Sequence, residues 1–467
     1  MSTDRIPRRA ARLRSARRRF AAAFAAVVAA LAVLAGAGAA VSLSQGPRVS
    51  DAQVDPAAAI EVAGARAILT ANQALAPIDP AQVVVEPEAA HTVEAAGRAV
   101  GVRFTVPLDA DTEYRVSVEG VRGVGGGPAA TLETTFRTPP AEVLILERSE
   151  SGDDTIYRAG LDGERVAVVS HPEIDDFRAT SDAIVVSVRE GGRARLIVTD
   201  RDGGNPRDVA LPGDGIIASL QVSERGGTIG YTYTDLDAAT GMQSVLHLSS
   251  LRDPGADAVP VEVGDEAPSV DRWRFVPDSS ALLMIDFDGE LILVEPDGAD
   301  PAFLGTAVTI DAVTRGTYTA VVERIDAGLV TLDLATGEET PITEADPEPG
   351  TLGFIAPLPD GDSVRRYAVL GDDGLPAAAS IAHVTAEGQA RELLHVAAPD
   401  VVQQVCVSPS GQYVAVLVAP DLIDNPYDMA AQPMPRTLET RIVEVDSGEP
   451  VGALRGFDIS WCQVGPW

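Results

Sequence analysis

The chain has 467 residues and a formal net charge of −33, because 69 acidic residues outnumber 36 basic ones. All the basic residues are arginines, and there is no lysine. Such a chain would repel a polyanion, so we expect no nucleic-acid partner. Hydrophobic residues make up 45% of the sequence, an ordinary globular share, and the length suits two or three domains.

The N-terminus predicts export. Residues 1–19 form an arginine-rich segment that we expect to stay in the cytoplasm. Residues 20–43 begin with an uncharged apolar run that is long enough to cross the hydrocarbon core as a transmembrane helix. A cleaved signal sequence is the alternative, since the small residues Ala37 and Ala39 could precede a cleavage site. The chain is then a single-pass cell-membrane protein with its C-terminal bulk outside, or a secreted protein.

The next segment predicts a β-sandwich. Residues 44–55 are polar and form a linker, and residues 56–138 contain short strand-like stretches separated by Pro, Gly, Asp and Asn. The stretches PLDADTEYRVSVEGVRG and LETTFRTPP resemble the closing pattern of bacterial Ig-like domains of the SbsA type. The matching residues are Leu108, Tyr114, Gly120, Phe136 and Thr138. The resemblance implies a spacer or adhesive module without catalytic residues.

A repeat of about 40–50 residues, the spacing of four-stranded propeller blades, occupies residues 141–467. Two stretches, SPSGQYVAV (408–416) and VPDSSALLM (276–284), resemble the WD40-like repeats of TolB-type propellers. We therefore predict an all-β fold in which a β-propeller of about seven blades follows the Ig-like sandwich. Complete units open at residues 174, 217, 270, 310, 352 and 403.

The first unit, residues 141–172, lacks an inner strand. The C-terminal stretch FDISWCQ (457–463) resembles the missing strand, so we predict that it completes the first blade and closes the ring. An open ring would leave unpaired strand edges at both ends. Closure would place Cys406 and Cys462 on neighbouring inner strands, where a disulfide is possible in an oxidising compartment. Two buried free thiols are the alternative.

No motif of catalysis or metal binding occurs in the chain. The five histidines form no metal-binding pair, and HExxH, GxSxG and Walker stretches are missing. His171 precedes Glu173, Asp175 and Asp176, a cluster that we interpret as a solvated acidic loop rather than a metal site. We therefore predict no catalytic residues, no metal and no cofactor.

Two long loops separate second and third strands, at 419–439 in blade seven and at 233–243 in blade three. Loops of this kind project from one face, and long loops on a rigid scaffold commonly carry binding function. Exposed aromatic and Met side chains suit a protein contact. The alternative is that they cover the channel mouth as a plug. The candidate partner-binding residues are Asp424, Asn425, Tyr427, Asp428, Met429 and Met434.

The function predicted from these features is that of a non-catalytic, membrane-anchored, extracytoplasmic binding or scaffold protein, whose propeller face recognises a protein or a cell-envelope glycan. One alternative is a propeller enzyme, a hydrolase or lyase with its site in the central channel. Another is a purely structural envelope module. An apolar patch at the blade-seven loop would favour partner binding. Perturbed carboxylates in a charged channel would favour the enzyme.

Overall fold

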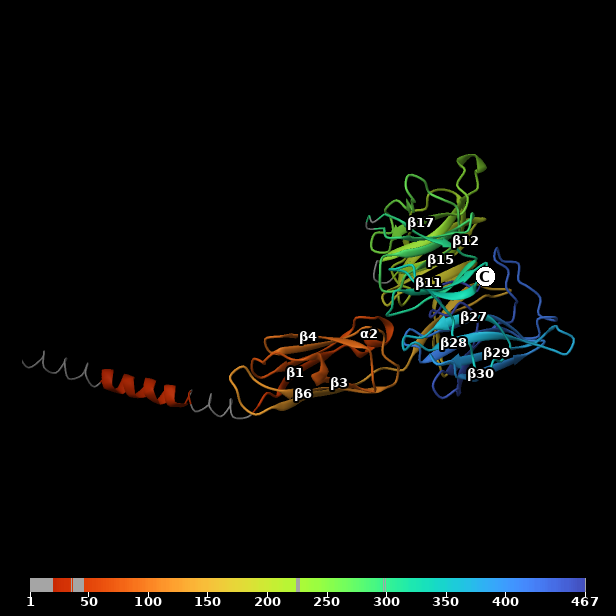
Figure 1. Ribbon diagram of the computed structural model, residues 1–467. Coiled ribbons are helices and arrows are strands. Elements are labelled where there is room, and N and C mark those ends of the chain that lie inside the picture. The colour runs from red at the N-terminus through yellow and green to blue at the C-terminus, as the bar shows by residue number, and fades with distance from the viewer. Residues whose placement is uncertain are drawn as a thin grey trace, which may run out of the picture. The chain divides into compact units, whose positions relative to one another are not determined.

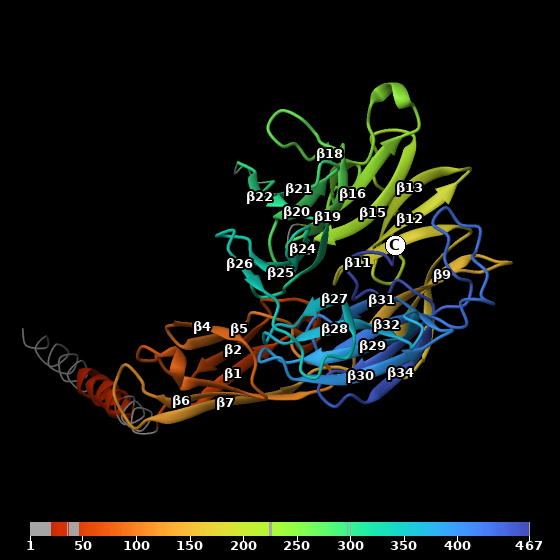
Figure 2. The ribbon, with the colours of Figure 1, turned by 45° about the vertical axis from the view of Figure 1, so that its right-hand side comes forward.

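The computed structural model describes residues 20–34, 36, 46–223, 227–296, 298 and 300–466. The chain divides into two compact units, of which the first contains residues 66–103 and 113–136 after the N-terminal part. The second unit contains residues 137–466 and also the two short segments 55–65 and 104–112. Figures 1 and 2 show the sheets of both units, with the C-terminal end lying among the sheets of the second.

The first unit consists of two antiparallel sheets with the orders β1-β2-β5-β4 and β3-β6-β7. Alternate side chains of their central strands are buried, among them Leu69, Val100 and Val116, because successive residues of a strand face opposite sides. The short helix η1 (Pro80–Gln82) precedes β3. The strands are β1 (Val49–Val54), β2 (Arg66–Ala71), β3 (Val83–Glu86), β4 (His91–Ala96), β5 (Ala99–Phe104), β6 (Glu113–Val121) and β7 (Ala130–Arg137).

The N-terminal helix extends over residues 20–34, and its apolar side chains are exposed. Within the described residues, no helix is both long enough and apolar enough to cross a membrane. Residue 35, residues 37–43 and the arginine-rich segment 1–19 lie outside the described residues. The membrane helix at 20–43 therefore stays a prediction.

Seven antiparallel sheets follow along the second unit, and we number them blades 1 to 7. Blade 1 has three strands, β8 (Glu142–Glu147), β9 (Asp154–Gly160) and β10 (Arg165–His171). Each later blade has four strands in sequential order. Blade 2 contains β11 (Ile174–Ala179), β12 (Ala183–Glu190), β13 (Arg193–Asp200) and β14 (Arg207–Asp208). Blade 3 contains β15 (Gly215–Ser223), β16 (Thr228–Asp235), β17 (Val245–Ser250) and β18 (Val259–Pro260). Blade 4 contains β19 (Val270–Phe275), β20 (Leu282–Asp286), β21 (Glu290–Val294) and β22 (Ala302–Thr306).

The remaining blades confirm the predicted repeat, because every complete unit opens within two residues of its predicted start. The helix η2 (Ala238–Thr240) lies in the long loop of blade 3. Blade 5 contains β23 (Thr309–Val313), β24 (Thr319–Arg324), β25 (Gly328–Asp333) and β26 (Glu339–Pro341). Blade 6 contains β27 (Thr351–Pro357), β28 (Ser363–Leu370), β29 (Pro376–Val384) and β30 (Ala390–Ala397). Blade 7 contains β31 (Val401–Val407), β32 (Tyr413–Ala419), β33 (Glu439–Glu444) and β34 (Pro450–Arg455).

Apolar layers join consecutive blades into a ring. Leu196 of blade 2 shares a buried cluster with Tyr231 of blade 3, and Leu246 of blade 3 shares another with Met284 of blade 4. The inner strands β11, β15, β19, β23, β27 and β31 contact one another in chain order. This arrangement of sheets around a common centre is a β-propeller, as predicted.

The C-terminal segment closes the ring beside β8. The amide of Leu146 donates to the carbonyl of Phe457 at 2.9 Å, and the amide of Phe457 donates back at 2.9 Å. The amide of Ser460 donates to the carbonyl of Leu144 at 2.9 Å. The predicted position of the tail is confirmed, but the prediction of a strand is wrong. Residue Asp458 has φ 59°, a left-handed conformation that interrupts the ladder, so only an isolated bridge forms.

A buried ionic network fastens the tail to blade 2. The Arg178 guanidinium lies 2.7 Å from Asp458 and 2.7 Å from Asp176, and its Nε donates to the carbonyl of Gln463 at 3.2 Å. Burial raises the pKa of Asp176 well above its ordinary value, the Arg178 charge opposes that rise, and the Asp458 charge adds to it. The interpretation of this region as a solvated acidic loop is wrong, because Asp175 and Asp176 are buried beside arginines.

A disulfide joins the tail to blade 7. Cys406 of β31 and Cys462 are bonded, with their Cα atoms 5.5 Å apart and a sequence separation of 56. Beside this bond, the Trp461 ring stacks on Tyr413 with 5.9 Å between the ring centroids. The last residues therefore contact blades 1, 2 and 7 at the same time.

Reduction of the disulfide should lower the free energy of unfolding by about 4 kcal/mol, the chain-entropy value for a loop of this length. The measurement is guanidinium denaturation with and without reductant. The Cys406→Ala/Cys462→Ala double variant should match the reduced protein and show no response to reductant. Equal unfolding free energies for the oxidised and reduced chains would contradict the prediction.

The substitution Arg178→Met should cost about 3–5 kcal/mol, because it leaves the carboxylates of Asp176 and Asp458 buried without their cation. Asp176→Asn should cost clearly less, since the pair between Arg178 and Asp458 remains. Urea denaturation at pH 7 measures both. Equal losses for the two variants would show that the ion pair has no special part in holding the tail.

Candidate functional site

The propeller has two faces with different connections. Antiparallel strands alternate in direction, so all loops between second and third strands end on one face, which we call the loop face. The turns between first and second strands end on the opposite face, which we call the turn face. The loop 419–439 connects β32 to β33 and therefore lies on the loop face.

Internal hydrogen bonds hold the loop 419–439 in shape. The buried Asn425 side chain donates to the carbonyls of Pro420 and Thr437, at 3.1 and 2.8 Å, and accepts from the amide of Thr437 at 3.0 Å. An isolated β-bridge pairs Tyr427 with Pro435. Met434 is buried in the apolar cluster shared by blades 1, 2 and 7. Asn425 and Met434 therefore support the loop from inside and do not face solvent.

The Asp428 carboxylate ties the loop to its neighbours. It accepts from the amides of Ala430 and Met434, at 3.2 and 3.1 Å, and pairs with Arg148 at 3.0 Å. The Arg148 guanidinium also donates to the carbonyls of Ile174 and Asp175. A cation shared between the loop and the start of blade 2 restricts the movement of the loop.

Three large apolar side chains project from this fixed loop. Ile423 is 86% exposed, Met429 is 93% exposed and Tyr427 is 51% exposed, while Asp424 is exposed beside them. A hollow of about 960 Å³ adjoins the loop, with Arg148, Met429 and other residues in its lining. Because Tyr427 and Met429 are exposed, they do not plug the channel, and that alternative interpretation is wrong.

Four other blades carry an exposed apolar residue on the same face. Each lies in the loop between second and third strands, is 59–74% exposed, and has at least one aspartate within three residues. The sequence analysis did not identify these residues as candidates, although an apolar residue between acidic ones at the tip of a hairpin can indicate a binding surface. They are Leu236, Phe287, Ile325 and Leu375, and together with Ile423, Tyr427 and Met429 we call them the apolar arc.

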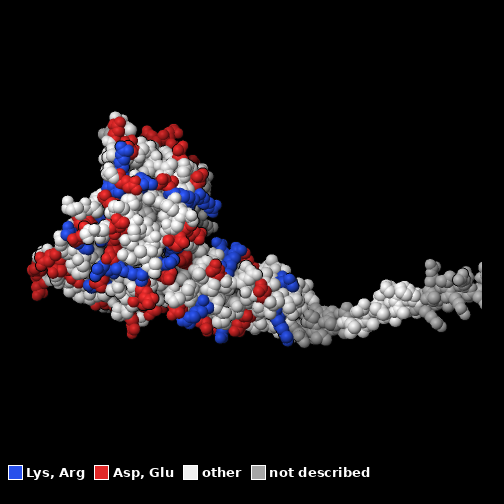
Figure 3. All heavy atoms as spheres, turned by 180° about the vertical axis from the view of Figure 1, so that it is seen from behind, with Lys and Arg blue, Asp and Glu red and all other residues white. Residues whose placement is uncertain are grey.

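The charge distribution follows the acidic composition. Figure 3 shows acidic side chains gathered on projecting edges of the second unit, with uncharged surface between them. In the arc, Asp286 and Asp288 flank Phe287, and Asp235 and Asp237 flank Leu236. The hairpin of Phe287 turns at Gly289, whose φ of 82° glycine adopts without steric cost. Local turn chemistry explains the aspartates and the glycine but not the phenylalanine.

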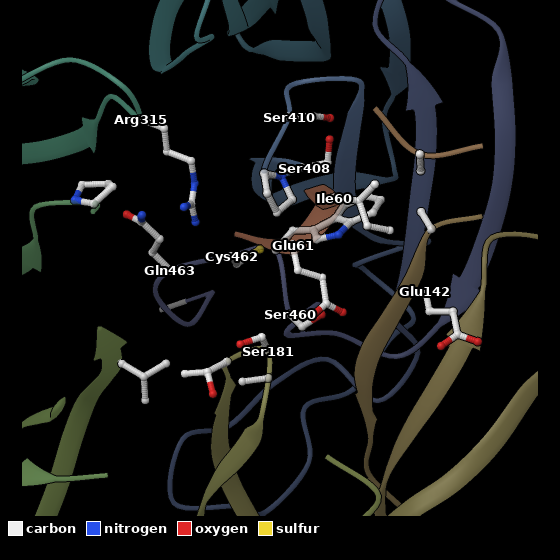
Figure 4. Close-up of a pocket in the computed structure, with 18 of the residues that line it drawn as sticks. Ile60, Glu61, Glu142, Ser181, Arg315, Ser408, Ser410, Ser460, Cys462 and Gln463 are labelled. Carbon is white, nitrogen blue, oxygen red and sulfur yellow. The ribbon is translucent and has the colours of Figure 1, made fainter. Parts of the chain in front are cut away.

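On the turn face, the channel opens into a cavity of about 490 Å³. Its lining includes Ser181, Ser408 and Ser460 from blade turns and the tail, and Glu61 from the short helix α2 (Pro56–Glu61). Asp55 caps α2 by accepting from the amide of Ala58, and a proline begins it. Figure 4 shows the Glu61 and Arg315 side chains reaching into this cavity.

The carboxylate of Glu61, which lines this cavity, has a pKa that differs from its ordinary value. Burial raises its pKa above the ordinary value, and the neighbouring charges of Asp182 and Glu142 add to the rise. Arg201, 3.5 Å away, opposes it. None of the five histidines lines the cavity, and the described residues contain no group of three or more side chains placed to hold a metal ion.

Comparison with known proteins finds resemblances only among solved structures. No family model matches the chain, and no curated protein matches it. Solved structures that resemble it include the β-propeller domain of Cps50 (Swd1) from Myceliophteria thermophila, at 14% identity and a TM-score of 0.39, covering 68% of this chain and 90% of that one. TolB from Acinetobacter baumannii is similar at 12% identity and a TM-score of 0.38, covering 81% and 82%.

An oligogalacturonate lyase in complex with manganese is similar at 11% identity and a TM-score of 0.43, covering 61% of this chain and 89% of that one. The seven sheets around a common centre, and not these resemblances, place the chain in the class of β-propellers. Propellers host many unrelated functions, so the class does not assign one to this chain.

The pKa of Glu61 should lie above its ordinary value, and Arg201→Gln should raise it further, because the Arg201 charge favours the ionised carboxylate. A carbon-13 NMR titration of labelled glutamate measures both values. The exposed Arg193→Gln variant is the control and should leave the pKa unchanged. A lower pKa in Arg201→Gln would contradict the assigned electrostatics.

The same shift predicts a pH effect on stability. As the pH rises through the ordinary pKa of a glutamate, Glu61 ionises in the unfolded chain before it ionises in the folded one, because its folded pKa is higher. The contribution of Glu61 to the free energy of unfolding should therefore fall as pH rises toward the folded pKa. Denaturation at a series of pH values, compared with Glu61→Gln, isolates this contribution.

Proposed function

We propose that this protein is a non-catalytic, extracytoplasmic binding protein that recognises a partner protein through the apolar arc. The observation that carries the proposal is that blades 3 to 7 each expose a large apolar side chain in the same kind of loop. Single exposed apolar residues are common on protein surfaces and need no explanation. A repeated exposure on one face of five consecutive blades supports an interaction surface.

The construction of the blade-seven loop supports the same proposal. Asn425 and Asp428 fix the loop backbone, so the backbone that carries Ile423, Tyr427 and Met429 has little freedom left to lose on binding. Aromatic and Met side chains are enriched at protein interfaces. Asp424, exposed between them, would contribute to a polar rim.

The charge of the arc favours one kind of partner. Aspartates surround the apolar tips, and the whole chain carries a formal charge of −33. An anionic lipid surface or an anionic glycan would be repelled, whereas a protein with an apolar cleft and a basic rim would be attracted. We therefore take a basic protein as the partner, in preference to a cell-envelope glycan.

The N-terminal part completes the proposal. In this arrangement residues 20–43 anchor the chain in the cell membrane, or direct its secretion, and residues 56–138 are an Ig-like spacer. The two-sheet topology of the first unit supports a spacer of that kind. A purely structural module would have no use for an exposed apolar arc.

A second candidate function, a hydrolase or lyase acting in the channel, has one observation in its favour. Glu61 combines a raised pKa with a position in the cavity of the turn face, as a general acid would. The cavity offers serine hydroxyls but no histidine to activate them, and the described residues contain no group of three or more side chains placed to hold a metal ion. Partner binding is therefore the better supported function.

A photo-reactive amino acid placed at Phe287 or Met429 should cross-link to one and the same basic protein in living cells. Phe303 is the matched control, since it lies on the outer strand of the blade that carries Phe287 and is 60% exposed against 63%. The cross-linker at 303 should give no such adduct. Adducts of equal yield at 287 and 303 would contradict the proposal.

Affinity measurements with the captured protein complete the test. Phe287→Ser and Met429→Ser should each weaken binding about tenfold or more, as loss of a buried interface anchor does, and Phe303→Ser should not. Binding should weaken as salt rises, because basic and acidic surfaces attract each other across the interface. A partner retained at full yield by Tyr427→Ala and Met429→Ser would show that the loop is not the contact.

A further inference from the structure

A second cavity, of about 320 Å³, lies in the channel, and its lining has the opposite charge from the molecule as a whole. Three arginines line it: Arg274 of β19, Arg315 in the turn after β23, and Arg366 of β28. Among the described residues that line it, Asp311 of β23 is the single one with a side-chain carboxylate. In a chain with a formal charge of −33, an excess of cations around one cavity is unusual.

The protein itself satisfies few of these donors. Arg274 donates from Nε to the carbonyl of Ile310 and from Nη2 to that of Asp311, both at 2.9 Å. Within the described part of the chain, no ion pair or hydrogen bond involves the guanidinium of Arg315 or of Arg366. A guanidinium has five N–H donors, so most of the donors at this cavity remain available.

The Asp311 carboxylate already accepts hydrogen bonds from the protein. Asp311 accepts from the amide of Ile355 at 3.3 Å and from the hydroxyl of Thr309 at 3.4 Å. Burial lowers the pKa of Arg274 to about 10, the Asp311 charge opposes this, and the positive charges of Arg272 and Arg178 add to it. The cations of the channel are thus crowded and incompletely neutralised.

We propose that this cavity binds a small organic or inorganic anion, a carboxylate or a phosphate, held chiefly by Arg315 and Arg366. Arginine pairs with both groups through two parallel N–H···O bonds. The side chains of Gln403 and Gln463, which also line the cavity, supply neutral donors. The volume is at the lower end of the range for small-molecule sites, roughly 300–1,000 Å³.

The route of entry is from the turn face. The cavity shares lining residues with the larger one on that face, among them Arg315, Ser408 and Gln463. Figure 4 shows Arg315 and Gln463 within this shared region. The site is separate from the apolar arc on the loop face, so its test is independent of the proposed partner.

Calorimetric titration of the full chain in a neutral detergent, at low ionic strength, tests the site. The probes are inorganic phosphate and citrate, with glucose as the uncharged control. We expect one or both anions to bind and glucose not to bind. Arg315→Gln and Arg366→Gln should each weaken anion binding at least tenfold, and the exposed Arg193→Gln should leave it unchanged.

The outcomes separate clearly. Binding of phosphate alone, or of citrate alone, supports the site and identifies the group that it recognises. Arg366→Lys retains the positive charge but lacks the paired N–H donors of a guanidinium, so it should weaken binding less than Arg366→Gln. It also serves as the control if Arg366→Gln does not fold. The proposal is overturned if neither anion binds at millimolar concentration, or if the Arg315→Gln/Arg366→Gln double variant binds as the parent does.

Discussion

The pairing of Phe457 with Leu146 is the contact on which the second unit depends. Blade 1 has only three strands of its own, and without the tail its inner edge would expose unpaired amides and carbonyls to the channel. The tail also reaches blade 2 through Asp458 and blade 7 through Cys462. Ring closure thus joins residues that are some three hundred positions apart in the chain, and a propeller has this constraint wherever its two ends meet.

Closure also determines what the channel contains. The tail brings Asp458 next to Arg178 and Asp176, where the loss of hydration opposes the mutual attraction of the charges. A hydrophobic plug would avoid that opposition. A buried ionic contact of this kind instead favours one position of the tail, because a shifted tail would leave charges without partners. Asp176 and Asp458 neutralise the Arg178 charge in this way. The excess positive charge of the channel therefore lies on Arg274, Arg315 and Arg366.

The two faces of the ring then offer different chemistry on one rigid frame. The loop face presents apolar side chains among aspartates, and the turn face leads to a channel lined by arginines. Both depend on the ring being stiff, since a loop such as 419–439 is fixed through Arg148 to the neighbouring blades. A macromolecule on one face and a small anion at the other are compatible with each other, because the sites share no residue.

The sequence by itself determined the positions where complete blades open, the place of the tail and the existence of the loop 419–439, because alternation and turn residues act over a few neighbours. It also indicated Cys406 and Cys462 as a pair, since equivalent repeat positions imply equivalent places in the ring. It did not reveal β1, which lies within the residues 44–55 that were predicted as a linker. Only the tertiary structure decided that Asp176 is buried against Arg178, that Asn425 and Met434 support the loop from inside, and that arginines of blades 4, 5 and 6 surround one cavity. Those arrangements depend on which inner strands face each other across the channel, and no local pattern records a distance between residues that meet only after the ring has closed.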